Sequence, residues 1–260
     1  MDQGLRILEN APVLEVVIDR PKANAIDAAT SRFMGDVFLA FRDDPAYRVA
    51  ILTGAGDRFF SAGWDLKAAS EGESYEADWG MGGFGGFPEL KGLNKPVICA
   101  VNGIAAGGGF EIVVSADLVM AADTAQFLLP EAFMGFPPDI GTVRLPRQIP
   151  PILAKEILLT GARVGMEQAL QWGLVNRVVP SGELMSTARA LAERICEAAP
   201  LAVEAILEMI RATSQMGVAE ALNFIRSGEV AAYRRALDSS DAIEGPRAFA
   251  ERRPPRWTGA

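Results

Sequence analysis

Short apolar runs that end in a glycine turn, each followed by a helical pattern, recur along this chain and limit its fold more than any other feature. One such run, Val49 to Leu52, ends in Thr53-Gly54-Ala55-Gly56, and another, Pro96 to Val101, ends in Asn102-Gly103. Strands that feed helices through short glycine turns are typical of α/β proteins. The sequence therefore predicts an α/β fold.

The remaining elements follow the same alternation. The chain opens with a predicted antiparallel pair turned at residues 9–12, and Asp27 is the predicted N-cap of the first helix. The two strands of this pair are Leu5 to Leu8 and Val13 to Ile18, and the first helix is Asp27 to Arg42. Three further strands are predicted at Leu118 to Ala121, Gln126 to Leu129 and Leu174 to Val179. Three further helices are predicted at Ile152 to Leu159, Glu167 to Trp172 and Leu184 to Ala198.

After Pro200 the pattern becomes helical throughout. We predict three successive helices there, Leu201 to Ser214, Val218 to Leu237 and Ser240 to Ala250. The chain is therefore expected to consist of a core, residues 1–199, and a carboxy-terminal helical region, residues 200–260.

Charge and hydropathy limit the classes of binding partner and the cellular location that we expect. The formal net charge is −8, and no long cluster of lysine and arginine is present, which argues against nucleic acid or an anionic membrane surface as the main partner. No window of about 18 apolar residues occurs, and the first ten residues lack a basic stretch followed by an apolar run. We therefore expect neither a spanning helix nor a signal peptide, and a cytoplasmic location.

The chain contains no histidine. This absence excludes a Ser-His-Asp triad, a Cys-His dyad, a histidine-ligated zinc site and a histidine general base. The two cysteines, Cys99 and Cys196, stand apart in apolar surroundings and are expected to be core residues. Proton transfer near neutral pH must therefore use carboxylates, lysine, cysteine, tyrosine or water.

Two glycine turns offer backbone N–H groups to a ligand. The segment 102–111 places three consecutive glycines at the start of a helix, where uncovered N–H groups can hold an anion or a developing oxyanion. The turn at 59–66 can add an N–H from Ala62 or Gly63, so two donors could converge on one thioester carbonyl oxygen. The alternative is that both turns only connect a strand to the next element and bind no ligand, since glycine turns after strands are common.

Two glutamates stand among apolar neighbours, Glu111 at the start of the helix and Glu131 twenty residues later. Charged groups rarely occupy such places unpaired. One interpretation is that each pairs with an arginine, for example Arg144 or Arg147. The other is a carboxylate pair that shares a water, with burial and like charge raising one pKa so that one group acts as acid and the other as base.

The segment from Glu71 to Pro88 combines six glycines with scattered aromatic residues. Glycine at this density disfavours a single conformation. We weigh two interpretations, a disordered surface loop and a flexible lid whose aromatic residues close over an apolar ligand.

Four motifs carry a family resemblance, which covers residues 5–257. They are Arg20-Pro21-Lys22 with Asn24-Ala25, Ser61-Ala62-Gly63-Trp64-Asp65-Leu66, Ala106-Gly107-Gly108-Gly109-Phe110-Glu111 and Pro130-Glu131. In this order and spacing they resemble the enoyl-CoA hydratase/isomerase (crotonase) superfamily. The resemblance implies a crotonase-like spiral of ββα repeats that holds CoA and the active site, and a carboxy-terminal helical region that assembles homotrimers or hexamers made of two trimers.

The resemblance also implies roles for individual residues. The oxyanion hole falls on the N–H groups of Ala62 and Gly108, Glu111 positions and deprotonates water, and Glu131 exchanges the proton at the α-carbon. The stretches that match the coenzyme A and substrate channel are Lys22, Ala23, Ala25, Gly63, Trp64, Asp65 and Leu66. No metal and no separate cofactor is implied, because coenzyme A is part of the substrate.

Finer features resemble one branch of this superfamily, the hydro-lyases that interconvert carnitinyl-CoA and crotonobetainyl-CoA. They are residues 20–27, Trp64 within 62–67, and residues 241–246. Trp64 is either a core aromatic or a face for a trimethylammonium group.

Other functions stay open: a general short-chain enoyl-CoA hydratase, an enoyl-CoA isomerase, or a non-catalytic acyl-CoA- or RNA-binding relative. Both glutamates and the acidic net charge count against the last of these. The turn at Pro138 to Arg144 is one residue shorter than the family pattern, and it caps the acyl pocket, so it leaves the choice of acyl chain open.

Overall fold

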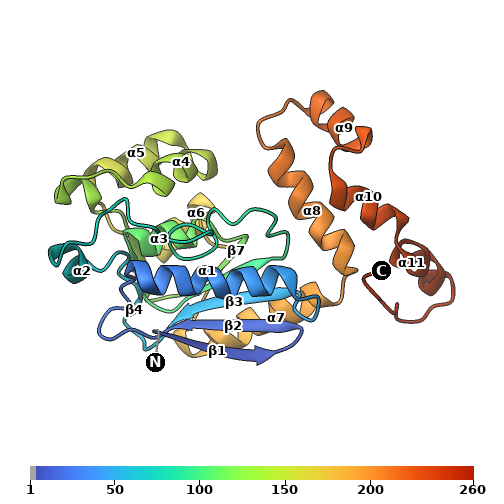
Figure 1. Cartoon of the computed structure of the whole chain (residues 1–260), viewed down its shortest axis with the longest axis horizontal. Helices are drawn as coiled ribbons and strands as arrows, with labels where there is room; N and C mark the ends of the chain where they lie inside the picture. Colours follow the sequence, from blue (N-terminus) through green and yellow to red (C-terminus); the bar gives the residue numbers. More distant parts are fainter. Residues whose placement is uncertain (1–3) are drawn as a thin grey trace.

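The structure is a computed structural model that describes residues 4–260 (Figure 1). Residues 1–3 belong to the amino-terminal segment in which no signal peptide is expected, and they lie outside the described residues. Within residues 4–260, no helix is both long enough and apolar enough to cross a membrane.

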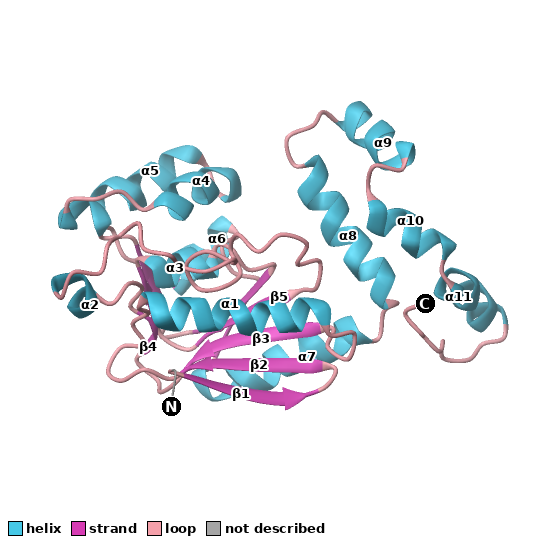
Figure 2. Cartoon of the chain, in the orientation of Figure 1, coloured by secondary structure: helices cyan, strands magenta, loops and turns pink. Residues whose placement is uncertain are grey.

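A six-stranded sheet forms the base of the fold (Figure 2). Its first two strands are antiparallel, as predicted, and every other neighbouring pair is parallel. The strands, in their order across the sheet, are β1 (Leu5–Asn10), β2 (Val13–Ile18), β3 (Val49–Gly54), β5 (Val97–Val101), β7 (Leu118–Ala122) and β10 (Arg177–Val179).

Two of these strands differ from their predicted bounds. β1 continues to Asn10, so the turn to β2 is only Ala11-Pro12. The predicted strand at 174–179 begins only at Arg177. Gly173 ends the preceding helix in a left-handed conformation, and the chain first reaches the sheet at Asn176, whose N–H donates to the Val119 carbonyl.

A second, four-stranded sheet lies next to the first. Its strands, in order, are β4 (Phe59–Ser61), β6 (Ile104–Ala106), β8 (Gln126–Leu128) and β9 (Val164–Gly165). Strands β3, β5 and β7 of the large sheet are each followed directly by β4, β6 and β8 of the small one, and then by a helical turn. The predicted repetition of two strands and a helix is therefore present, and it brings three successive helical starts to one end of the small sheet.

Both faces of the large sheet are covered, as its apolar strands require. In β3, Ala50 and Leu52 pack on one side with Phe38 of helix α1 (Ala28–Asp43), while Val49 and Ile51 pack on the other with helix α7 (Leu184–Cys196). Asp27 caps α1 as predicted, by accepting a hydrogen bond from Thr30 N–H at 2.8 Å.

The shorter helices surround the small sheet. They are α2 (Leu66–Ser70), α3 (Gly108–Val113), a 3-10 turn (Glu131–Met134), α4 (Asp139–Gln148), α5 (Pro151–Thr160) and α6 (Met166–Trp172). A further 3-10 turn, Ser181–Glu183, precedes α7. Helices α2 and α4 are not predicted from the sequence; α4 contains Pro146 and Gly141, two residues that oppose a helical prediction.

The carboxy-terminal region holds four helices where the sequence predicts three. They are α8 (Pro200–Thr213), α9 (Val218–Ser227), α10 (Ala231–Asp238) and α11 (Ser240–Ala250). The predicted helix at 218–237 is divided because Gly228 adopts a left-handed conformation with φ of 94° and Val230 is extended. These helices extend away from the two sheets (Figure 1).

The glycine-rich segment is not a disordered surface loop over its second half, residues 82–87, which are buried. Gly86, with φ of 85°, approaches α1 so closely that a Cβ there would lie 2.4 Å from the carbonyl carbon of Met34. Ser31 of α1 holds the segment by donating to the Trp79 carbonyl and accepting from Gly85 N–H. Its glycines therefore allow close packing against α1.

Candidate active site

The two glycine turns singled out in the sequence approach each other at the end of the small sheet. Gly63 has φ of 79°, and a Cβ on it would lie 2.6 Å from Gly108 N and 2.7 Å from the Ala106 carbonyl oxygen. A Cβ on Gly109 would lie 2.3 Å from the Ser61 carbonyl oxygen. Only glycine permits this contact, so the sequence brings the backbones of residues 61–64 and 107–109 side by side.

Not every N–H of the first turn is free to bind a ligand. Ala62 N–H, one of the two expected oxyanion donors, donates to the Ala23 carbonyl at 2.9 Å, and Gly63 N–H donates to Ser61 Oγ at 3.1 Å. Asp65 N–H donates to the Ile26 carbonyl. Within the described part of the chain, Trp64 N–H has no hydrogen-bond acceptor, so the available donor lies two residues beyond the expected one.

The second turn contains Gly108, the other residue expected to donate. Gly107, with φ of 55°, is the N-cap of α3 and donates its N–H to the Leu128 carbonyl at 3.0 Å. Gly108 follows as the first residue of the helix, where an N–H has no intrahelical acceptor.

Glu111 and Glu131 are both buried, at 5% exposure each, and both line one cavity. Glu111 comes from α3, and its Oε1 accepts a hydrogen bond from Gly141 N–H of α4 at 2.7 Å. Glu131 begins the 3-10 turn, and its Oε2 has no hydrogen-bond partner among the described residues. A buried carboxylate oxygen without a protein partner is rare in proteins, and this one is available to accept a hydrogen bond from a ligand or water.

Among residues 4–260, neither glutamate has an arginine as its hydrogen-bond or ion-pair partner. Arg144 donates to the Pro88 carbonyl, and Arg147 donates to the Val143 carbonyl within its own helix. The structural alternative considered from the sequence, that these arginines neutralise the glutamates, is therefore wrong.

Burial changes the ionisation of both carboxyls. It raises the pKa of Glu111 to about 8, with smaller contributions from the charges of Asp139 and Glu131 and an opposing one from the Gly141 N–H. It raises the pKa of Glu131 to about 7, again assisted by Asp139. Between these values one carboxyl can be protonated while the other is ionised, as acid–base catalysis by two carboxyls requires.

Six of the sequence-predicted residues line this cavity. They are Ala62, Trp64, Leu66, Gly108, Glu111 and Glu131. Lys22, Ala23, Ala25, Gly63 and Asp65 are not among its lining residues. Ala23 instead accepts the Ala62 N–H, and Lys22 is exposed beside the cavity-forming turn.

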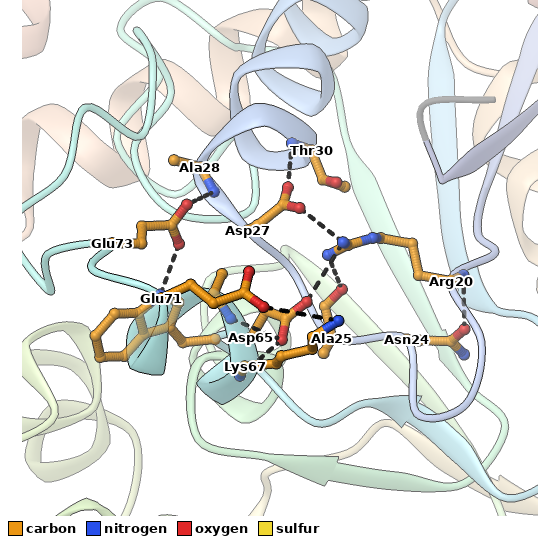
Figure 3. Close-up of polar contacts among 12 residues, drawn as sticks. Arg20, Asn24, Ala25, Asp27, Ala28, Thr30, Asp65, Lys67, Glu71 and Glu73 are labelled. Carbon is orange, nitrogen blue, oxygen red and sulfur yellow. Dashed lines mark hydrogen bonds and ion pairs between the residues drawn. The ribbon is translucent and has the colours of Figure 1, made fainter. Parts of the chain in front are cut away.

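A polar network fixes this neighbouring segment against the first turn (Figure 3). The Arg20 guanidinium donates to the Ala25 carbonyl and Asp27, and it lies 3.4 Å from the Asp65 carboxylate. Asp65 also accepts hydrogen bonds from the first N–H groups of α2. Asn24, buried with φ of 51°, donates to the carbonyls of Ala55 and Phe59.

Several residues of the site are not identified from the sequence. Asp139, Phe136 and Met134 line the cavity, and Gly141 supplies the donor to Glu111. Glu73 accepts the indole N–H of Trp64 at 2.8 Å. Asp139 and Gly141 lie in the turn noted for its departure from the family pattern, and Glu73 lies in the glycine-rich segment, so the sequence pointed to these segments but not to the individual residues.

Residues 9–260 match the family model described as enoyl-CoA hydratase/isomerase, and the chain belongs to this family. The crystal structure of enoyl-CoA hydratase from Mycobacterium tuberculosis is similar with a TM-score of 0.90 and 38% identity, covering 99% of this chain and 100% of that one. An enoyl-CoA hydratase from Bacillus anthracis is similar with a TM-score of 0.89 and 31% identity over 99% and 100% of the two chains. The predicted crotonase-like fold is thereby confirmed.

Curated relatives are more similar in sequence. The carnitinyl-CoA dehydratases of Proteus mirabilis and Shigella flexneri are 56% and 57% identical to this chain over 260 residues, which is 100% of both chains in each comparison. The predicted branch of the family is therefore supported over the whole length of the chain.

Proposed function

We propose that this protein is a hydro-lyase that interconverts carnitinyl-CoA and crotonobetainyl-CoA by reversible loss and addition of water. The observation that carries the chemistry is the pair of buried glutamates without arginine partners, in a cavity that also contains Trp64 and Gly108. The full-length identity to carnitinyl-CoA dehydratases supports the choice of substrate.

The thioester carbonyl oxygen is held by the N–H groups of Trp64 and Gly108. Ala62 N–H does not take part because it already donates to Ala23. As the α-carbon gains carbanion character, negative charge moves onto this oxygen, where two fixed donors stabilise the enolate-like transition state by several kcal/mol. No metal or redox cofactor is needed for this step.

The two glutamates move the protons. In the hydration direction Glu111 takes a proton from water, the water oxygen bonds to the β-carbon, and the α-carbon receives a proton from Glu131. Dehydration runs the same steps backwards: Glu131 removes the α-proton, and Glu111 protonates the departing hydroxyl, which leaves as water. The hydrogen bond from Gly141 N–H holds the Glu111 carboxyl in position for this exchange.

The coenzyme A part of the substrate is assigned to the segment 22–25 and the residues that follow Ala62. Lys22 is exposed there, so its ammonium group can reach a phosphate. Arg20, Asp27 and Asp65 hold this segment against the first turn.

The oligomer and the division of the chain are also proposals. Residues 1–199 form the catalytic core and residues 200–260 the region that assembles trimers or pairs of trimers. The exposed apolar side chains of the last four helices support this assignment.

The test compares crotonobetainyl-CoA with crotonyl-CoA by following the absorbance of the conjugated enoyl thioester. We expect crotonobetainyl-CoA to be hydrated with the higher kcat/KM. Equal use of both substrates would identify a general enoyl-CoA hydratase, double-bond migration without hydration would identify an isomerase, and no reaction with either would support a non-catalytic binding protein.

A further inference from the structure

Four aromatic side chains form a cluster at the active-site cavity, Trp64, Tyr75, Trp79 and Phe136, which we call the aromatic cluster. Trp64 is its centre: its ring centroid lies 5.6 Å from that of Tyr75, 6.0 Å from Phe136 and 6.3 Å from Trp79. All four side chains line the cavity and are only partly buried, so ring surface is presented to a ligand.

The central indole is fixed by a carboxylate that the catalytic mechanism does not use. Trp64 Nε1–H donates to Glu73 Oε1 at 2.8 Å, and the other oxygen of Glu73 accepts the N–H of Ala28, the first residue of α1, at 3.0 Å (Figure 3). A carboxylate on the indole N–H pushes electron density into the ring. The faces of such a ring attract a cation more strongly than those of a free indole.

Tyr75 is also held in place. Its hydroxyl donates to the Pro137 carbonyl at 3.0 Å, and its ring lies 4.9 Å from that of Phe136. Burial raises the pKa of the Tyr75 phenol above its usual range, so this side chain stays neutral at physiological pH. The cluster therefore offers rigid π surface.

The charge of the cavity favours a cationic ligand. Four acidic side chains line it, those of Glu89, Glu111, Glu131 and Asp139, and its described lining includes no lysine or arginine to balance them. Burial raises the pKa values of Glu111 and Glu131, so these two carry only part of a negative charge near neutral pH. Inside a cavity of low dielectric constant, a neutral acyl chain leaves this negative charge unbalanced. A fixed positive charge on the acyl chain offsets it.

We propose that the aromatic cluster, with Trp64 as its central ring, is the subsite for a quaternary ammonium group on the acyl chain, and that it selects cationic acyl-CoA thioesters over neutral ones of the same shape. This inference rests on the proposed hydro-lyase function. An apolar wall alone would accept a neutral branched chain equally well.

The experiment uses a neutral substrate of matched shape. In 5,5-dimethylhex-2-enoyl-CoA a quaternary carbon replaces the ammonium nitrogen of crotonobetainyl-CoA, so only the charge differs. For the wild-type enzyme we expect kcat/KM to be roughly 10–100-fold higher for the cation, as several cation–π contacts of the usual strength would give. Equal kcat/KM for the two substrates would overturn the inference while leaving the hydro-lyase function intact.

Substitutions in the aromatic cluster test whether these side chains cause the preference for the cationic substrate. Trp64→Leu should reduce the preference for the cation to less than about threefold, and Trp64→Phe should retain part of it. Tyr75→Phe keeps the ring and should keep the preference, whereas Tyr75→Leu should lower it. If Trp64→Leu does not fold, these two Tyr75 variants test the subsite instead. Trp172→Leu, a tryptophan outside the cavity, is the matched control.

An undiminished preference in both Trp64→Leu and Tyr75→Leu would contradict the assignment of the subsite to the cluster. Loss of the preference in Trp172→Leu as well would contradict it too, because the effect would then be general. Absence of any hydration of crotonobetainyl-CoA by the wild type would instead overturn the proposed function.

Discussion

The buried carboxylates of Glu111 and Glu131 lower the stability of the fold whenever they are charged. A glutamate in the unfolded chain ionises near pH 4.5, whereas burial raises the pKa of Glu111 in the fold to about 8. Between these pH values the folded state binds more protons than the unfolded state, so the free energy of unfolding falls as the pH rises. This loss in the free energy of unfolding is complete once the pH lies well above 8, where Glu111 is fully ionised in the fold.

Glu111→Gln should therefore stabilise the protein at high pH. Glutamine is neutral and its carbonyl oxygen can still accept the Gly141 N–H. We expect the free energy of unfolding at pH 9 to increase by roughly 2–4 kcal/mol, and the gain to disappear at pH 4.5. Denaturant unfolding at the two pH values measures this increase in the free energy of unfolding. Glu156→Gln, on the exposed face of α5, is the control. A stabilisation by Glu111→Gln that does not depend on pH would contradict the account.

The pH dependence of activity follows from the same two groups. Catalysis needs one protonated and one ionised carboxyl, and burial raises the pKa of Glu131 to about 7 and that of Glu111 to about 8. We predict that kcat/KM is highest between these values and declines on both sides. A profile that is flat from pH 5 to pH 9 would show that these carboxyls do not carry the proton transfers.

At the scale of elements, the contact between the glycine-rich segment and α1 fixes one wall of the cavity. Gly86 allows this contact, since a Cβ there would meet the backbone of Met34 and Gly35 at 2.4 and 2.6 Å. Gly56 has a similar φ, 80° against 85°, but no atom within 4 Å of a Cβ. The two glycines therefore have nearly the same φ and differ in packing.

Gly86→Ala should destabilise the protein more than Gly56→Ala by roughly 1–3 kcal/mol, the usual range for overpacking. It should also raise KM, because Phe84 in the same segment lines the cavity. Thermal unfolding and steady-state kinetics of the two variants provide the comparison. Equal destabilisation would mean that the segment does not pack on α1 as described.

Much of the architecture can be predicted from local sequence, and the parts that cannot depend on distant partners. Glycine turns and apolar runs predict most strands and the cap at Asp27, because those signals lie in adjacent residues. The free donor at Trp64 instead of Ala62 depends on a carbonyl at Ala23, thirty-nine residues away in the sequence. Likewise, the link between Glu73 and Trp64 arises only when the glycine-rich segment folds back onto the first turn.

At the scale of the whole molecule, the last four helices leave large apolar side chains in solvent. They are Ile206, Ile210, Val218, Leu222, Leu237, Ile243 and Phe249. Phe249 alone is 86% exposed. Apolar surface of this extent on one region is typical of an interface, which agrees with the proposed assembly. The oligomeric state and the cytoplasmic location stay predictions.

Light scattering should give three or six times the mass of one chain for the wild type. Phe249→Glu should shift the mass toward that of a single chain, because it places a charge in the apolar interface. Leu8→Glu, at an exposed position of β1 in the large sheet and outside residues 200–260, should not change the mass. A wild type that is monomeric at micromolar concentration would contradict the proposed role of residues 200–260.

The central claim is that Glu111 and Glu131 together add water to, and remove it from, a bound enoyl thioester. The most direct test is the kcat for hydration of crotonobetainyl-CoA by the wild type, Glu111→Gln, Glu131→Gln and the double variant. Each single variant should lose about 10²–10⁴-fold, the usual contribution of a general acid or base, and the double variant should lose little more, because the two groups act as a unit. Single variants that retain activity within tenfold of the wild type would contradict the claim.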